Sequence, residues 1–301
     1  MRAVRIHRFG PPEVIVVDDV PRPSPGEGEV LVRVTAAGVG PWDAIIREGR
    51  SKVSPQPPLT LGSDLSGFIE AVSPAVIGFS VGDEVYGVTN PQFCGAQAEY
   101  AVASAGMIAQ KPKSLSNLDA ASAPVIAVTA YQMLFEYAGA KQGHTVMITG
   151  AAGNVGAYAV QFALHAGVHV VAVARPGDNA FLRRLGAQAI FDPSGTETLP
   201  EVEAVLDTVG GHTVERCVSA IKPGGKLVSV VSEVRSDRPD IESIFFYAEV
   251  TTERLRTLSK LFEDGSISAR IGSILPLAQA RIAHEMLAGA PHKPGKIMLQ
   301  V

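Results

Sequence analysis

Two hydrophobic patterns divide the chain near residue 110. Before this point, short β-branched or alternating runs occur at residues 14–17, 30–34, 65–72 and 85–88. Such runs predict strands, and the proline- and glycine-rich segments between them are unfavourable for long helices. We therefore expect an antiparallel, barrel-like β domain in this half, with one short helix over residues 42–50.

After residue 112 the pattern becomes helical and then alternates. A helical segment with an internal proline (120–140) follows an N-cap sequence at 116–119. The alternation of predicted strands and helices after residue 145 predicts β-α-β crossovers and a doubly wound parallel sheet. The expected strands are 145–149, 168–174, 188–191, 202–206 and 225–231, and the expected helices are 155–166, 179–185, 213–220, 252–263 and 277–288. A last strand, 296–301, has no helix after it, so we expect it to return to the first domain.

A glycine-rich turn lies at the centre of the alternating half. Residues 146–163 read VMITGAAGNVGAYAVQFA, which predicts a buried strand, a turn and a helix. Gly150, Gly153 and Gly156 punctuate the turn with the spacing A-x-G-x-x-G from Ala151 and an additional glycine before it. Placed between a strand and a helix, this spacing indicates that a dinucleotide pyrophosphate approaches the backbone at a helix N-terminus. The alternative is a tight turn without a ligand.

Composition narrows the classes of function. At 301 residues two domains are expected, and a net charge of −4 argues against nucleic acid or an anionic membrane as the main partner. Cys94 and Cys217 form no C-x-x-C pair, so we expect neither a disulfide framework nor a zinc knuckle. The N-terminus lacks the apolar run of a signal peptide, and no apolar stretch reaches membrane-spanning length. These features fit a cytoplasmic protein.

The residue after the second strand of the alternating half favours NADPH over NADH. An acid at this place would accept from the ribose of NAD, whereas an arginine suits the 2′-phosphate of NADP. Here Arg175 follows the strand, and the first acid, Asp178, comes only after Pro176-Gly177. A guanidinium can bind phosphate bidentately. The alternative makes Arg175 a solvated loop charge.

These stretches carry a resemblance to a known family. The chain resembles the medium-chain dehydrogenase/reductase superfamily, and within it the zinc-independent quinone oxidoreductase (zeta-crystallin-like) branch. The matching stretches run nearly end to end: residues 36–49, 61–72, 79–87, 95–102, 128–134, the glycine turn, 185–192, 206–211, 223–230 and 295–301. The resemblance implies a GroES-like β-barrel catalytic domain (1–115 and 267–301) and a Rossmann NADP-binding domain (116–266). It also implies a homodimer in which the edge strands of the two Rossmann domains pair.

The sequence departs from the zinc-dependent relatives at their metal ligands. Those relatives carry a cysteine where this chain has Gly40 or Pro41, and Gly-His-Glu where it has Gly62-Ser63-Asp64. Zinc needs thiolate, imidazole or carboxylate ligands, and Asp64 alone cannot hold it. We therefore expect no metal. Without a Lewis acid, hydride transfer is expected to go to an electron-poor acceptor, a quinone or an α,β-unsaturated carbonyl.

Candidate site residues follow from the same comparison. The family's G-V-N-P-x-D reads G-V-G-P-W-D here, so Gly40 replaces an asparagine and opens space that Trp42 is expected to fill in part. The candidate catalytic residues are Asp43, Trp42 and Thr129, and the candidate substrate pocket holds Trp42, Asp64 and Phe93. The cofactor is expected to contact Thr129, Gly150, Ala152, Gly153, Asn154, Val155, Gly156, Arg175, Thr208, Val209, Val231, Phe245, Phe246 and Lys296.

Each of these residues also has a structural alternative. Asp43 can cap the short helix that follows, Trp42 can pack in the core or at an interface, and Asp64 can cap a turn. Thr129 can bond its own helix backbone, and Lys296 can be a surface charge that begins a strand.

Three functions remain open on sequence grounds. The first is an NADPH-dependent quinone or enone reductase. The second is a trans-acting enoyl reductase of the polyketide type, which shares the mechanism and differs in substrate. The third is a binding or sensor protein that keeps the dinucleotide turn without turnover, which the missing asparagine at Gly40 makes worth testing.

Overall fold

A computed structural model describes residues 1–53, 55–233 and 237–301. Its chain forms two compact units, residues 1–125 with 250–301 and residues 126–249. Among the described residues, no helix is long and apolar enough to cross a membrane.

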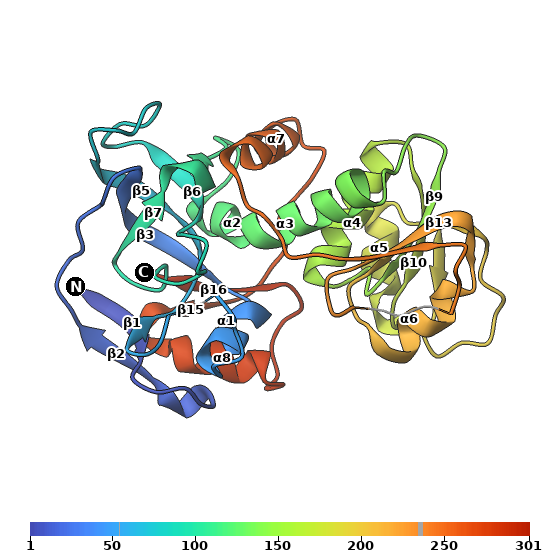
Figure 1. Cartoon of the computed structure of the whole chain (residues 1–301), viewed down its shortest axis with the longest axis horizontal. Coiled ribbons are helices and arrows are strands. Elements are labelled where there is room, and N and C mark those ends of the chain that lie inside the picture. Colours follow the sequence, from blue (N-terminus) through green and yellow to red (C-terminus); the bar gives the residue numbers. More distant parts are fainter. Residues whose placement is uncertain (54, 234–236) are drawn as a thin grey trace. The chain divides into compact units, whose positions relative to one another are not determined.

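Two β-sheets make up the first unit (Figure 1). One sheet has the order β2-β1-β4 and the other the order β15-β16-β3-β5-β6-β8, with β7 paired to β3. The strands are β1 (Arg2–Ile6), β2 (Ile15–Asp19), β3 (Glu29–Val39), β4 (Leu59–Thr60), β5 (Asp64–Val72), β6 (Glu84–Val88), β7 (Tyr100–Ser104), β8 (Ile108–Gln110), β15 (Ile271–Pro276) and β16 (Lys296–Gln300). A core of mostly β-branched side chains, including Val32, Val34, Leu65 and Val85, is buried between them. This is the mostly antiparallel β domain expected from the first hydrophobic pattern and the GroES-like unit that the resemblance implies; the β15–β16 pair is parallel.

The final strand returns to this unit, as the sequence predicts. β16 pairs antiparallel with β3 and parallel with β15, which joins the end of the chain to its N-terminal half. The helices of the unit are α1 (Pro41–Arg47), α2 (Asn117–Ser122), α7 (Thr252–Glu263) and α8 (Ala280–Leu287), with short 3-10 turns η1 (Pro12–Val14), η2 (Ala105–Met107) and η5 (Leu277–Gln279).

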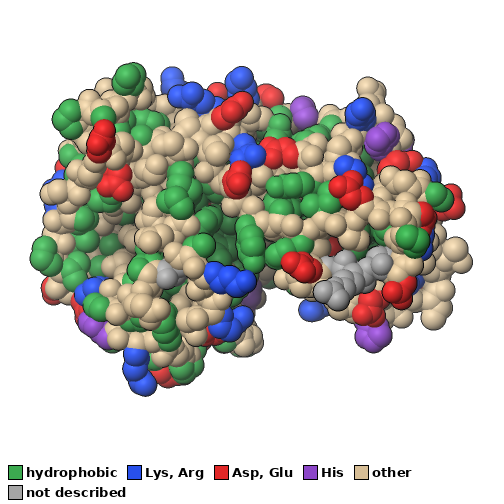
Figure 2. Space-filling model, viewed as in Figure 1, with side chains coloured by type: hydrophobic (Ala, Val, Ile, Leu, Met, Phe, Trp, Pro, Cys, Tyr) green, Lys and Arg blue, Asp and Glu red, His purple; other side chains and the backbone are tan. Residues whose placement is uncertain are grey.

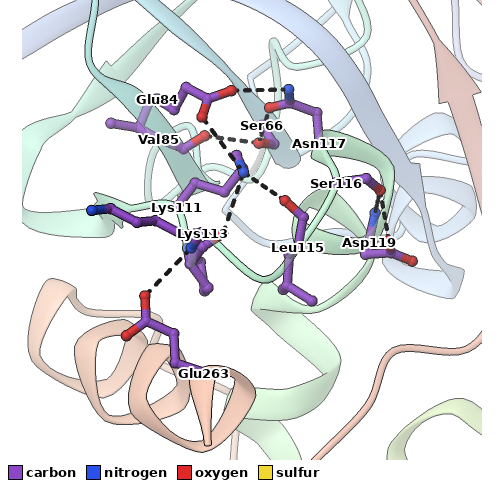
Figure 3. Close-up of polar contacts among 11 residues, drawn as sticks. Ser66, Glu84, Val85, Lys111, Lys113, Leu115, Ser116, Asn117, Asp119 and Glu263 are labelled. Carbon is purple, nitrogen blue, oxygen red and sulfur yellow. Dashed lines mark hydrogen bonds and ion pairs between the residues drawn. The ribbon is translucent and has the colours of Figure 1, made fainter. Parts of the chain in front are cut away.

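Polar contacts attach α2 and α7 to the strands of the first unit (Figure 3). The Ser66 hydroxyl on β5 donates to Asn117 Oδ1 at 2.7 Å, and Lys111 Nζ donates to the Leu115 carbonyl at 2.6 Å. The Lys113 amide donates to Glu263 Oε1 of α7 at 3.3 Å. The sequence boundaries at 115/116 and 266/267 placed both helices in the dinucleotide-binding domain. In the structure α2 packs on β3 and β5, and α7 packs on β8.

A parallel sheet forms the second unit, with the order β11-β10-β9-β12-β13-β14. Every described pair in it is parallel. The strands are β9 (Thr145–Thr149), β10 (His169–Val173), β11 (Ala189–Phe191), β12 (Val202–Asp207), β13 (Ile221–Ser229) and β14 (Glu242–Phe245). Between them run α4 (Asn154–His165), η4 (Pro176–Asp178), α5 (Asn179–Leu185) and α6 (Gly211–Val218), after α3 (Pro124–Tyr131) and the π-helix η3 (Gln132–Tyr137).

The strand order places a topological switch beside β9. From β9 the chain goes through α4 to β10 and β11 on one side, and then returns to β12, β13 and β14 on the other. α4 packs on β9 and β10, whereas α6 packs on β9, β12 and β13. In open sheets of this kind, ligands bind outside the carboxyl ends of the strands at the switch. The expected Rossmann architecture is confirmed.

Candidate active site

The glycine turn leaves β9 at this switch. Gly150 has φ +61°, a left-handed conformation that favours glycine, and α4 begins at Asn154 with Gly153 as its N-cap. A Cβ atom at Gly156 would lie 2.2 Å from the Gly150 carbonyl oxygen and 2.8 Å from Ala151 Cα. The helix therefore packs against the turn at a distance that only glycine permits. Because Gly153 has no side chain to cap them, the first N–H groups of α4 are available to an anion, and the turn fits a pyrophosphate.

Four more of the predicted cofactor residues follow neighbouring strands at the same edge of the sheet. Arg175 follows β10 and is exposed, and Thr208 and Val209 follow β12. Val231 follows β13 closely, and the Val209 and Val231 side chains are 50% and 46% exposed. Exposed apolar side chains beside a glycine turn suit the flat rings of a dinucleotide. The structure thus brings these residues together in the second unit.

Asp207 holds this edge in place, and the sequence analysis missed it. Its buried carboxylate accepts from the hydroxyls of Thr149 and Ser229, both at 2.8 Å, and from the backbone N–H of Gly210 at 2.9 Å. The carboxylate therefore links the ends of β9, β12 and β13. The sequence does contain a sign of this role, because Asp207 is an acid at the end of a buried strand, within the stretch LDTVGG.

Phe245 ends β14 and Phe246 follows it, and Phe245 pairs with Ser229 of β13, so they come at the same edge of the sheet. Thr129 is on α3 and nearly buried. Phe246 is also nearly buried, and its ring packs on Tyr137 with centroids 4.2 Å apart. Phe245 is half-buried, edge-on to Tyr247 at 5.1 Å.

In the first unit, a buried ion pair joins two strands that are far apart in sequence. Lys296 at the start of β16 donates from Nζ to Asp64 Oδ2 at the start of β5, 2.8 Å away, and the side chains are 1% and 0% exposed. Asp64 Oδ1 accepts the Val125 N–H at 3.1 Å. The alternative that Lys296 is a surface charge is therefore wrong, since burial and the carboxylate surround its ammonium group.

Trp42 on α1 covers the place of the family asparagine. A Cβ atom at Gly40 would lie 2.4 Å from Trp42 Cη2, so the indole occupies the space that glycine leaves open, as expected. The indole Nε1–H donates to Ser63 Oγ at 2.9 Å, and Lys296 Nζ lies 4.1 Å from the ring centroid. A hydrogen bond and a cation–π contact thus fix the partly exposed ring. Ser63 was not predicted as its partner.

Asp43, the next residue on α1, is fully buried. Its Oδ2 accepts the Gly40 N–H at 2.8 Å, which is the capping contact that the sequence analysis held open. Its Oδ1 has no hydrogen-bond partner within the described ranges. Burial raises the pKa of Asp43 to about 7, against the lowering effects of the Gly40 N–H and the Lys296 ammonium.

Phe93 and Cys94 lie in the connection between β6 and β7. Phe93 has φ +57° and packs against the core of the first unit. Burial raises the pKa of the Cys94 thiol, and the charge of Asp43 raises it further. Cys94 is therefore a poor thiolate nucleophile or ligand.

The donor set at Asp64 does not fit zinc. Gly40 and Pro41 offer no ligand atom, the Ser63 hydroxyl accepts from the indole, and the Asp64 carboxylate is paired with an ammonium group. Across the part of the chain that the structure describes, no group of three or more His, Cys, Asp or Glu side chains could hold a metal ion. The Lys296 ammonium group therefore provides the positive charge beside Asp64.

Comparison with known proteins now identifies the family. Residues 26–113 match the model of the alcohol dehydrogenase GroES-like domain, and residues 185–299 match that of the zinc-binding dehydrogenase. Quinone oxidoreductase from Lama guanicoe is 30% identical over 99% of this chain and 97% of its own length. The chain belongs to the medium-chain dehydrogenase/reductase superfamily.

Solved structures of this superfamily match over the whole chain. Quinone oxidoreductase from Coxiella burnetii is 32% identical, with a TM-score of 0.91 and coverage of 100% of this chain and 99% of that one. A mycobacterial superfamily member solved with NADPH is 28% identical, with a TM-score of 0.87 and full coverage of both chains. An oxidoreductase built on a nicotinamide dinucleotide is the activity that this family membership supports.

Proposed function

We propose that this chain is a zinc-independent, NADPH-dependent reductase of quinones or α,β-unsaturated carbonyls. The observation that carries the proposal is the buried Lys296–Asp64 pair, at the position where zinc-dependent relatives hold ligands. Without a metal to polarise a carbonyl, the acceptor itself must stabilise the negative charge that reduction creates. Quinones and enones do so by delocalising it.

The residues at the carboxyl edge of the parallel sheet support NADPH as the cofactor. The N-terminus of α4 and the glycine turn would hold the pyrophosphate, and exposed Arg175 would pair with the 2′-phosphate. When bound, NADPH supplies the hydride. The likeness to a superfamily member solved with NADPH supports this choice of dinucleotide.

Binding of NADPH and NADH to an Arg175→Ala variant tests the cofactor. We expect NADPH to bind about 10-fold more weakly than to the wild type, because a charge-assisted contact to phosphate is lost, while NADH affinity stays the same. Arg183→Ala removes a second exposed arginine, on α5, and is the matched control. Equal losses for both dinucleotides, or none, would contradict the proposed role of Arg175.

Oxidation of NADPH with a panel of acceptors tests the reaction. After dialysis against a chelator, the protein should reduce quinones and enones and should leave saturated aldehydes unreduced. Activity that returns only with added zinc would reject the proposal. Tight NADPH binding without turnover of any acceptor would instead favour the sensor function, and turnover only of acyl-carrier-bound enoyl groups would favour the trans-acting enoyl reductase.

A further inference from the structure

Three ionisable side chains are buried together in the first unit. Asp43 and Asp64 are 0% exposed and Lys296 is 1% exposed, and both Lys296 and Asp64 act electrostatically on Asp43. If every group were ionised, the cluster would hold two negative charges and one positive charge. A buried carboxylate without a counter-charge is costly, so the cluster is expected to retain one proton.

The hydrogen bonds distinguish the two carboxyl groups. Both oxygens of Asp64 accept, one from the Lys296 ammonium at 2.8 Å and one from the Val125 N–H at 3.1 Å, which favours its ionised form. In Asp43, Oδ2 accepts from Gly40, whereas Oδ1 has no partner among the described residues. The Gly62 N–H also faces this carboxyl and lowers its pKa, but Asp43 lacks the direct ion pair that Asp64 makes, so Asp43 is the carboxyl that takes the proton.

We propose that Asp43 holds the exchangeable proton of this cluster and supplies it to the reduced acceptor. The second part of this inference rests on the proposed function, and the first does not. Asp64 and Lys296 do not transfer the proton themselves. Because Lys296 pairs with Asp64, Asp43 is the carboxyl of the cluster that has no direct ion-pair partner, and the proton stays on it.

The proton balance is simple. Reduction of a quinone or enone adds a hydride and leaves an oxyanion, which needs one proton to give the neutral product. The Asp43 O–H bond breaks and the proton goes to that anion, directly or through one water, leaving the Asp43 carboxylate. Solvent then reprotonates the carboxylate. No further oxidant or reductant is required.

The environment of Asp43 supports this role at neutral pH. The groups that face it are Lys296 from β16, Asp64 from β5, Cys94 from the β6–β7 connection, and the N–H groups of Gly40 and Gly62. Burial is the largest effect and raises the pKa of Asp43 to about 7, where a general acid can be both loaded and unloaded.

Infrared titration of the protein alone tests where the proton resides. The wild type should show a protonated carboxyl band that persists to pH 6 and disappears around pH 7. Asp43→Asn should lack the band, while the amide oxygen still accepts the Gly40 N–H. Asp19→Asn, at an exposed site, is the matched control and should keep the band. Asp43→Glu should restore a band with a different midpoint, which keeps the test valid if the asparagine variant folds poorly.

Steady-state kinetics test whether the proton is delivered. Asp43→Asn should lower kcat about 10²-fold with little change in KM, and should flatten the fall of kcat that we expect of the wild type above neutral pH. If Asp43 served only to cap α1, kcat and its pH profile would be unchanged in this variant. That result would overturn the proposal that Asp43 delivers the proton.

The two measurements separate the inference from the proposed function. If the wild type reduces no acceptor but the band depends on Asp43, the proposed function fails and the proton assignment stands. If the protein is an active reductase but the band survives in Asp43→Asn, the inference fails and the proposed function stands.

Discussion

Gly40 and Trp42 act as one unit at the scale of single residues. Gly40 has the extended backbone of a helix N-cap (φ −135°), a conformation that asparagine also adopts. What excludes a side chain there is the indole of Trp42, whose Cη2 atom lies 2.4 Å from the place of a Cβ. The departure from the family motif is therefore compensated by a neighbour two positions later.

Gly40→Asn should consequently destabilise the protein despite the good capping propensity of asparagine. We expect a loss of about 1–3 kcal/mol in the free energy of unfolding, because the new side chain must displace the ring. In the double variant with Trp42→Ala the loss should be smaller than the sum of the single losses, as measured by urea denaturation in a double-mutant cycle. Strict additivity would show that the two positions do not share this space.

At the scale of elements, a buried pair holds α1 against α8. Arg47 on α1 donates from Nη1 to His284 Nδ1 of α8 at 2.9 Å, and from Nε to the Gly10 carbonyl at 3.0 Å. Because an arginine can only donate, His284 Nδ1 must accept and the ring is neutral with its proton on Nε2. Burial, and then the charge of Arg47, lower the pKa of His284 to about 3. Trp42 and Asp43 lie on α1, so this pair supports the site.

The histidine makes the first unit sensitive to acid. In the unfolded chain the imidazole takes up a proton below pH 6.5, whereas the folded protein excludes it until about pH 3. Stability is therefore lost as the pH falls from 6.5 towards 3. His284→Asn keeps an acceptor for Arg47 but does not titrate, so its stability lacks this loss at acid pH. The difference between the wild type and this variant in the free energy of unfolding should therefore narrow by about 1–3 kcal/mol between pH 7 and pH 4.

Urea denaturation at the two pH values measures this difference. His292→Asn, at an exposed position, is the control and should show a constant difference from the wild type. A deficit in His284→Asn that stays constant with pH would contradict the neutral, buried assignment.

At the scale of the whole molecule, the alternation of strands and helices predicted the parallel sheet and the return of β16. The relevant signals are local in both cases: hydrophobic period, turn residues and a strand without a following helix. The candidate cofactor site could be proposed from the sequence for the same reason, since the glycine turn and Arg175 are recognisable within one β-α-β unit.

The remaining features depend on contacts between distant residues. Lys296 and Asp64 are 232 positions apart, and Arg47 and His284 are 237 apart, so no local pattern could pair them. The helical patterns of α2 and α7 likewise carry no information about which unit they pack in. Contacts made by side chains such as Ser66 and Glu263 determine the unit in which each helix packs (Figure 3).

Assembly is a further property at this scale. On the face seen in Figure 2, acidic and basic side chains are interspersed, which provides no field of one sign to repel a second copy. β14 pairs with β13 and lies at the end of the strand order, so its other edge can pair with another chain. We expect light scattering to give the mass of a homodimer that persists on dilution, and a monomer mass at micromolar concentration would contradict this.

The transfer of deuterium from cofactor to product tests the central claim most directly. Protein stripped of metal by a chelator is mixed with NADPH deuterated at the transferred C4 position and an α,β-unsaturated ketone, and the product is examined by mass spectrometry and NMR. We predict one deuterium at the β-carbon of the saturated ketone and a yield that added zinc does not change. Product formation that depends on zinc, or product without deuterium, would contradict a metal-free hydride transfer.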